Sequence, residues 1–279
     1  MNAPRFWIPS AAIAAAAILV LSTAPAVAQR YESSSGNAPG ADRAIGGGGH
    51  RYRAPLPPEA GAPAGRPFGG ASRGGEDARI CQSLAALVPS TREVGRNGRE
   101  YTSVWALTAA AHPTFWFYVP YAITSDEPAE FVLFDDQRRI MYRKQDIVLS
   151  HESGIIGISL PDTAPALEAG RMYRWNFQTR CGGEVVFVEG WIQRTELDSN
   201  LTAEIDRALP LDQAAIYAEN GIWYDALTIL GNLRREDPEH LDVVNAWVGL
   251  LDVLDLGEDE EDIILTPIVS IESAEASAE

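Results

Sequence analysis

Between residues 79 and 195 the chain repeats one pattern, a short stretch of alternating apolar and polar residues followed by a turn sequence. A period of two is typical of a strand with one buried face. Turn sequences such as "TSDEP" at 124–128 and "CGGE" at 181–184 separate the stretches, because Gly, Pro and Asp favour tight turns. The predicted strands are Tyr101–Ala106, Thr114–Val119, Ala129–Asp135, Arg139–Arg143, Asp146–Ser150, Gly154–Leu160, Met172–Thr179 and Glu184–Arg194. They predict a mainly β fold, an antiparallel β-sandwich of Ig-like or jelly-roll-like type. The stretch 79–88 fits a short helix or an extra strand.

The stretch "HPTFWFYVPY", His112–Tyr121, carries aromatic side chains on both faces of its predicted strand. Since side chains alternate across a strand, Phe117 faces one way and Trp116 and Tyr118 the other. Aromatic side chains dominate the energetics of protein cores. We therefore predict a central strand with one face inside the sandwich and the other covered by the segment around Cys81 or by C-terminal helices. The alternative is an exposed platform for a sugar or a peptide.

The last predicted strand places Glu189 on the same face as Phe187 and Trp191. A carboxylate among such neighbours has a raised pKa if it is buried alone. An isolated buried charge is costly, so we favour an ion pair with Arg171 or Arg174 on the neighbouring strand.

Residues 196–257 change to the apolar spacing of amphipathic helices, and we predict three or four helices there. Asn220-Gly221 and Asp237-Pro238 mark helix boundaries. The stretch "GIWYDALTILGNLRREDP" at 221–238 resembles the second helix of a tetratricopeptide repeat. Stacked repeats need about three units to be stable. The resemblance therefore implies helices that lean on the sandwich or on another protein.

The two ends of the chain differ in composition from the segments between them. Residues 1–28 combine an early Arg, an apolar run and an "AVA" site, the features of a cleaved signal peptide. Residues 29–78 are rich in Gly and Pro and predict a disordered linker. Residues 258–279 predict a disordered acidic tail, in which "IILTPIVSI" at 263–271 is suited to add an edge strand or to dock in a groove.

The chain has two cysteines, Cys81 and Cys181. In an exported protein an even pair predicts a disulfide. Export places the protein in the periplasm, at the outer membrane or outside the cell.

The net charge of −17 disfavours nucleic acid and anionic membrane surfaces as partners. Recognisable motifs of serine hydrolases, zinc proteases and phosphate-binding loops are missing from the sequence. Acidic residues are numerous, so a pair with the spacing of a glycosidase cannot be picked out from sequence. We therefore expect neither catalytic residues nor a metal or cofactor.

Several blocks resemble one family of exported cyanobacterial proteins known as domain of unknown function 928. They are "HPTFWFYVPY", "AEFVLFDDQRRIMYR", "GIIGISLP", "LEAGRMYRWNFQTRC", "VFVEGWIQR" and "AENGIWYDALTIL". The resemblance covers about residues 79–256. It implies an envelope or extracellular location and supplies no reaction.

Together these features predict a non-catalytic binding or structural module of the cell envelope that acts through protein–protein contacts. The candidate partner-binding residues are Trp223, Tyr224 and Trp247, as an exposed aromatic patch on the helices. The alternative is a carbohydrate-binding or glycoside-cleaving sandwich. Its candidate platform is Trp116, Tyr118 and Glu189.

Overall fold

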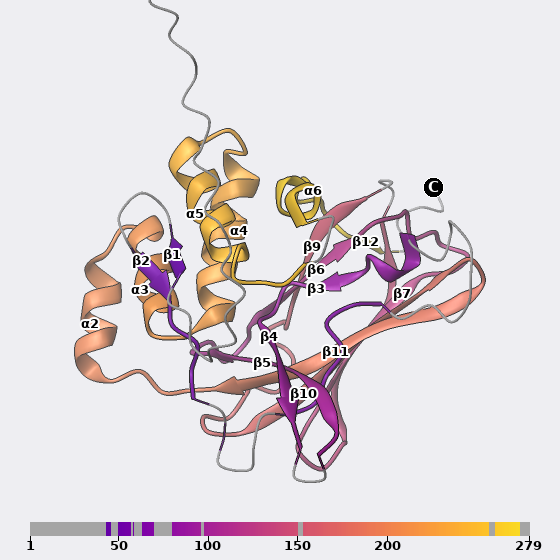
Figure 1. Cartoon of the computed structure of the whole chain (residues 1–279), viewed down its shortest axis with the longest axis horizontal. Coiled ribbons are helices and arrows are strands. Elements are labelled where there is room, and N and C mark those ends of the chain that lie inside the picture. The colour runs from indigo at the N-terminus through magenta and orange to yellow at the C-terminus, as the bar shows by residue number, and fades with distance from the viewer. Residues whose placement is uncertain are drawn as a thin grey trace, which may run out of the picture. The chain divides into compact units, whose positions relative to one another are not determined.

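A computed structural model describes residues 43–45, 50–56, 58, 63–69, 80–95, 98–149, 153–256 and 260–273 (Figure 1). The predicted signal peptide at 1–28 and the end of the predicted tail at 274–279 lie outside the described residues. Within the described residues, none of the helices is both long and apolar enough to cross a membrane.

The strands and helices follow one another in this order: β1 (Arg43–Ile45), β2 (His50–Tyr52), β3 (Ala85–Ala86), β4 (Ser90–Val94), β5 (Glu100–Thr108), β6 (Thr114–Val119), β7 (Ala129–Phe134), β8 (Ile140–Val148), β9 (Gly154–Ser159), β10 (Met172–Cys181), β11 (Glu184–Arg194), α2 (Ser199–Arg207), α3 (Pro210–Glu219), α4 (Trp223–Glu236), α5 (Leu241–Leu251), α6 (Glu260–Leu265) and β12 (Glu272–Ser273).

Over the described residues the strands form a large sheet, β12-β8-β7-β10-β11-β5-β4, a small sheet, β3-β6-β9, and the separate pair β1-β2. The prediction of a mainly β, sandwich-like fold followed by helices is confirmed. One pair departs from antiparallel order, since β11 runs parallel to β5 from Trp191 to Arg194. In this arrangement β11 pairs with β10 on one side and with the early strand β5 on the other.

Aromatic side chains fill the space between the two sheets. Phe117 of β6 stacks on Phe177 of β10 with ring centroids 4.6 Å apart, and Phe115 lies 4.8 Å from Phe131 of β7. Aromatic pairs of this kind add about 0.5–1.5 kcal/mol each beyond the burial of their area. The inner face of β6 is therefore core, as its alternation predicts.

The other face of β6 is covered by helices, so the layers run from α4 and α5 through the small sheet to the large sheet (Figure 1). Trp116 donates its indole N–H to Thr228 Oγ1 of α4 at 3.1 Å, and its ring lies 6.3 Å from that of Trp247 in α5. Gly231 permits this close approach, because a Cβ there would lie 2.4 Å from the Trp116 ring. The prediction of a central strand buried on both faces is confirmed, and the C-terminal helices are its cover.

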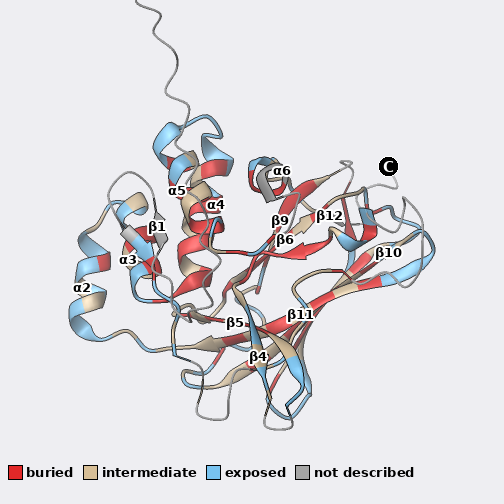
Figure 2. Cartoon of the chain, viewed as in Figure 1, coloured by how far each residue is buried: buried red, intermediate tan, exposed pale blue. Residues whose placement is uncertain are grey.

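Burial differs along the helical segment (Figure 2). Half-buried and buried residues make up most of α4, whereas α2 contributes a single buried side chain, Ile205, to the described core. α4 therefore attaches the segment to the sandwich, and α2 lies at its outer side.

The predicted strands agree with the structure where apolar alternation is clear, and β6 and β11 have the predicted bounds. The predicted strands 139–143 and 146–150 form one strand, β8, because the chain bends at Asp146 (φ 58°) without leaving the sheet. Strand β4 was not predicted, since its residues "STREV" are mostly exposed and lack an apolar face. In the stretch 79–88, one helical turn at 80–82 precedes strand β3, so both alternatives are present.

The predicted disordered linker at 29–78 is wrong for its described residues. Residues 63–66 lie between β5 and β11, where Gly65 N–H donates to Thr102 O at 2.9 Å, and residues 67–69 pair with the segment of β3. Arg66 and Glu189 exchange two backbone hydrogen bonds of 2.8 and 2.9 Å. Further upstream, Tyr52 is buried with its ring 4.9 Å from that of Trp223. The Gly- and Pro-rich composition wrongly indicates disorder here, because backbone hydrogen bonds between strands need no apolar side chain. Glycine is also suited to position 65, because a Cβ there would lie 2.7 Å from Glu189 O.

The predicted disordered tail at 258–279 is likewise wrong over residues 260–273. Ile263 and Ile264 are buried, and the Arg234 guanidinium donates to the carbonyl oxygens of Ile264 and Leu265 at 2.9 Å each. Beyond α6, Ile268 bridges to β9, and β12 pairs with β8. The apolar stretch 263–271 therefore docks on the domain, as its sequence indicates.

Candidate functional site

The predicted partner-binding patch on the helices is wrong, because Trp223, Tyr224 and Trp247 are 0%, 1% and 0% exposed. The indole N–H groups of Trp223 and Trp247 donate to Leu87 O and Ile264 O at 2.9 and 3.0 Å. Tyr224 Oη accepts the indole N–H of Trp175 at 2.9 Å, and burial raises the pKa of this phenol. These aromatic rings dock the helices on the sandwich, because the small sheet has an apolar outer face to cover.

The alternative platform of Trp116, Tyr118 and Glu189 does not form one site. Trp116 is 1% exposed beneath α4, and Tyr118 is half-buried on the same strand. Glu189 lies on the large sheet, on the face turned away from the small sheet.

The predicted disulfide is present between Cys81 and Cys181, with Cα atoms 5.7 Å apart. It ties the helical turn before β3 to the hairpin of β10 and β11. In that hairpin Cys181 pairs with Glu184 across a two-residue turn. Gly182 and Gly183 both have positive φ, 60° and 82°, which the type I′ turn requires of its two central residues.

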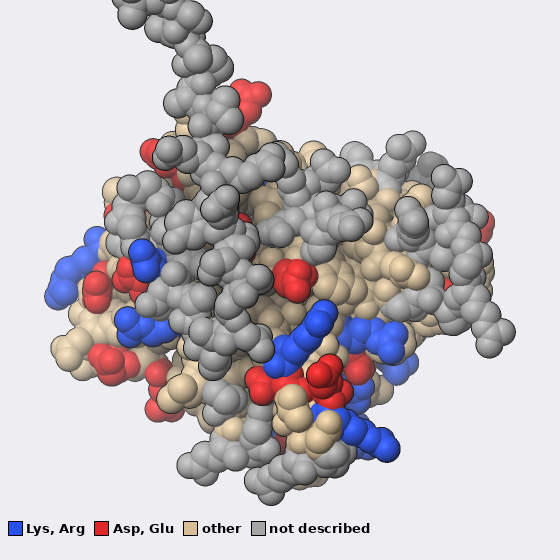
Figure 3. All heavy atoms as spheres, viewed as in Figure 1, with Lys and Arg blue, Asp and Glu red and all other residues tan. Residues whose placement is uncertain are grey.

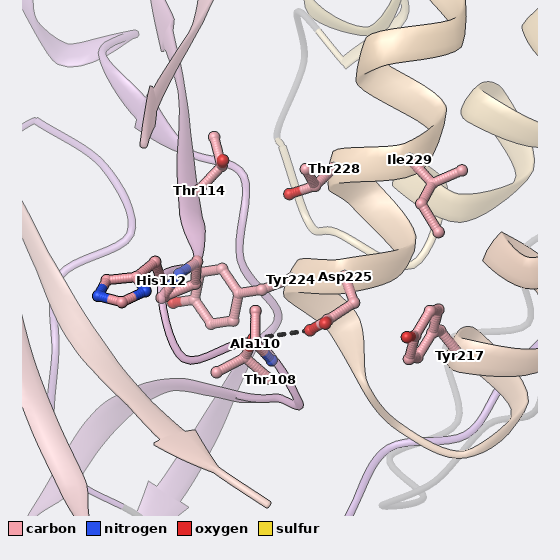
Figure 4. A pocket seen from close by; sticks show the side chains of 10 residues that line it. Thr108, Ala110, His112, Thr114, Tyr217, Tyr224, Asp225, Thr228 and Ile229 are labelled. Atoms are coloured by element: carbon pink, nitrogen blue, oxygen red, sulfur yellow. Dashed lines mark hydrogen bonds between the residues drawn. The ribbon is translucent and has the colours of Figure 1, made fainter. Parts of the chain in front are cut away.

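A small cavity lies where the connection between β5 and β6 meets α3 and α4 (Figure 4). Its volume is about 190 Å³, and its lining includes Thr108, His112, Tyr217, Tyr224, Asp225 and Thr228. The His112 ring contacts the loop after β9, where Nε2 lies 3.1 Å from Ala164 O and Nδ1 lies 3.6 Å from the exposed Asp162 carboxylate. Binding sites for small molecules commonly measure 300–1,000 Å³, so this cavity is small for an organic ligand.

Asp225 is the half-buried acidic group of this cavity. Its carboxylate accepts the hydroxyl of Thr108 at 2.7 Å and the N–H of Ala109 at 3.0 Å. Burial raises the pKa of Asp225, and these hydrogen bonds oppose that rise only in part. The carboxylate thus joins the end of β5 to the first turn of α4, a structural role.

Replacing Asp225 by alanine is expected to lower the free energy of unfolding by about 1–3 kcal/mol near neutral pH, because the buried Thr108 hydroxyl and the half-buried Ala109 N–H lose their acceptor. Urea unfolding of the two proteins measures the difference. The control is Asp212→Ala in the first turn of α3, where the acidic side chain is exposed. A loss no larger than that of the control would contradict the assigned role.

The Asp225→Asn variant tests the charge alone. A folded-state pKa above the ordinary 3.8 means that the carboxyl favours folding most when protonated, and that this contribution is lost as pH rises through the folded pKa. The stability of the wild-type protein relative to Asp225→Asn is therefore expected to fall as pH rises from about 3.5 to 7. The pKa of Asp135 is shifted in the opposite direction, below its ordinary value of 3.8. Although burial raises its pKa, the amide and guanidinium of Arg139 and the amide of Gln137 lower it overall. Parallel stability curves for wild type and Asp225→Asn would contradict the raised pKa.

The outer face of the large sheet carries a row of large side chains in direct register. Ile140 of β8 lies opposite Phe134 of β7, Phe134 opposite Arg174 of β10, Arg174 opposite Trp191 of β11, and Trp191 opposite Trp105 of β5. We call these five residues the outer row. Ile140 is 51% exposed, and the other four are partly exposed. Their immediate neighbours along the strands, such as Trp175 and Ile192, are fully buried on the inner face.

Polar and charged side chains flank the outer row. Within the row, Arg174 forms an ion pair with Glu189, so of the two partners predicted from sequence, Arg171 and Arg174, the second is the one observed. Further along the sheet, Arg143 lies 3.3 Å from the Glu130 carboxylate, and the Arg66 guanidinium lies 4.5 Å from the Phe187 ring centroid. On the face of the molecule visible in Figure 3, acidic and basic side chains also lie side by side. The outer row therefore combines three aromatic rings with Ile140 and the paired Arg174, and the charges around it largely cancel.

Sequence reasoning placed Trp191 beside Glu189 but missed Trp105. Its strand, "EYTSVWALT", has apolar residues on both faces, and alternation alone does not say which face is inside. The pairing of β5 with β11 is what brings the two tryptophans together.

The fold and the outer row define a helix-covered β-sandwich with an aromatic outer face. The chain belongs to the family described as Domain of Unknown Function (DUF928), whose family model matches residues 68–264. The predicted family is thereby confirmed. The cyanobacterial origin, the export of the protein and the likeness of 221–238 to a tetratricopeptide repeat stay predictions. A comparison with curated proteins gives no match.

Proposed function

We propose that the protein is an exported, non-catalytic binding module of the cell envelope, and that its binding surface is the outer row. The observation that carries this proposal is the register of Phe134, Arg174, Trp191 and Trp105 across four neighbouring strands. Trp and Arg are the residues that most often dominate the energy of binding interfaces.

The assignment of binding to this face is supported by the burial of the other aromatic clusters. Trp116, Trp223 and Trp247 are engaged in holding the helices on the small sheet. Phe117, Trp175 and Phe177 fill the space between the sheets. The partly exposed rings of the outer row do not fill the core, although the Trp191 indole N–H donates to Ala64 O at 3.0 Å. Their position on a sheet keeps the entropy cost of binding low.

Export is supported by two independent features. The N-terminal 28 residues have the composition of a signal peptide. The disulfide between Cys81 and Cys181 joins buried and half-buried positions of the folded domain, and such bonds persist in oxidising compartments.

A non-catalytic role is supported by the contacts of three acidic side chains of the large sheet and its turns. Glu189 is paired with Arg174, Glu130 with Arg143 and Asp135 with Arg139. Each of these contacts holds neighbouring strands or a turn together.

Replacing Trp105 and Trp191 together by alanine is expected to weaken binding to a washed cell-envelope preparation by about 30-fold or more, the effect of losing one or two interface hot spots. Co-sedimentation of the purified, disulfide-bonded protein measures this. Leu241→Ala is the matched control, because Leu241 is an apolar side chain 76% exposed at the start of α5. Urea unfolding establishes that the variants are folded. Equal binding by the double variant and the wild type would overturn the proposal.

A further inference from the structure

We infer that the ligand of the outer row is an uncharged glycan chain lying across the strands. This inference rests on the binding role proposed above and deepens it. Three features of the described residues carry it, namely the geometry of the rings, the polar groups beside them and the charge balance of the face.

The first feature is geometry. Neighbouring strands lie about 4.8 Å apart, so the outer row presents a side chain at each such step from Phe134 to Trp105. That step is close to the length of one sugar unit in an extended chain. Trp191 and Trp105 stand side by side on parallel strands. Indole rings offer flat apolar surfaces with little rotamer freedom to lose, and the C–H faces of pyranose rings are apolar and flat as well. A chain of sugars therefore matches the row in both spacing and shape.

The second feature is the supply of hydrogen-bonding groups along both sides of the row. Asn176 lies one step along from Arg174 and opposite Glu189, and Gln193 lies on β11 beyond Trp191. Both amides are half-buried, and each combines an acceptor oxygen with two donor hydrogens. Gln193 is already oriented by donating to Gly170 O at 3.1 Å. Hydroxyl groups at the edges of sugar rings both donate and accept, so amides next to aromatic rings suit them better than they suit an apolar peptide surface.

The third feature is charge. Arg174 and Arg143 are each paired with a carboxylate, Glu189 and Glu130. Arg66 stacks on Phe187 at the edge of the face. The whole chain has a net charge of −17. The electric field of such a charge repels anionic polymers. The paired arginines have little charge left to attract a phosphate or a uronic acid, and an uncharged glycan meets no repulsion.

The experiment uses the disulfide-bonded protein and the same envelope preparation after three treatments: periodate, which cleaves the vicinal diols of sugars, a broad protease, and neither. We expect periodate to reduce binding at least tenfold and protease to leave it within twofold. Raising NaCl from about 0.05 to 0.5 M, which shortens the screening length severalfold, is expected to leave binding within twofold. The Trp105→Ala/Trp191→Ala variant should lose the periodate-sensitive binding, and Leu241→Ala should keep it.

The possible failures of the inference and of the proposed function are distinct. If protease abolishes binding while periodate does not, and the tryptophan variant still binds less, the partner is a protein and the glycan inference is wrong while the binding role stands. If binding is sensitive to periodate and is lost at high salt, the ligand is an anionic polymer and the inference is also wrong. If the tryptophan variant binds like wild type under every treatment, both the inference and the proposed function fall.

Discussion

Replacement of Cys81 and Cys181 by alanine is expected to lower the free energy of unfolding by about 4–5 kcal/mol. The two residues are separated by 100 positions, and a cross-link over a long loop removes many conformations from the unfolded chain. The link also holds the helical turn before β3 against the β10–β11 hairpin, so both sheets depend on it. Urea unfolding of the oxidised wild type and the double variant measures the difference.

Reductant supplies the control for this prediction. It should bring the wild type close to the double variant and leave the double variant unchanged, since the other residues contain no thiol. A difference between the oxidised wild type and the variant of less than about 1 kcal/mol, the size of an ordinary substitution, would mean that the disulfide adds little to the fold.

Replacement of Trp116 by alanine is expected to cost about 3–5 kcal/mol, the range for removing a large aromatic side chain from a core. The indole fills the space between β6 and α4, donates to Thr228 and lies against Gly231. Its removal leaves a cavity at the contact that holds the helices on the sandwich. We expect a lower midpoint in urea and a change in the near-ultraviolet circular dichroism of the neighbouring Trp247.

Trp105→Ala is the matched control for Trp116→Ala, because it removes the same side chain from a strand of the same domain. Trp105 is partly exposed on the outer row, so its loss is expected to cost about 1 kcal/mol. If Trp105→Ala proved as damaging as Trp116→Ala, the outer row would be part of the core rather than a binding surface. The two variants therefore test the burial pattern on which the proposed function rests.

The parts of the fold that are predictable from sequence are those that a single local property determines, such as the alternation of side chains along a strand. Strands β6 and β11 were predicted with their observed bounds because their side chains alternate between different environments. The ion pair of Arg174 and Glu189 was predictable as well, because an unpaired carboxylate among aromatic residues is costly. The disulfide followed from the even number of cysteines.

The remaining features depend on contacts that no local pattern encodes. Residues 63–69 pair with strands of both sheets through backbone hydrogen bonds, and such bonds do not depend on apolar side chains. The aromatic stripe around Trp223 has the same sequence signature whether it faces a partner or the sandwich, and the structure places it on the sandwich. The outer row requires Trp105 and Trp191 to be neighbours across 86 residues of chain, a register set only when β11 pairs with β5.

The position of residues 63–66 between β5 and β11 has a consequence for folding during synthesis. A chain that emerges from its N-terminus presents this segment and β5 long before β11 is available to close the other side. Contacts between distant parts of a sequence form slowly, because the intervening chain must first be ordered. The sheet therefore closes only after nearly 200 residues have been delivered, and until then the unpaired edges of these strands are open to association with other chains.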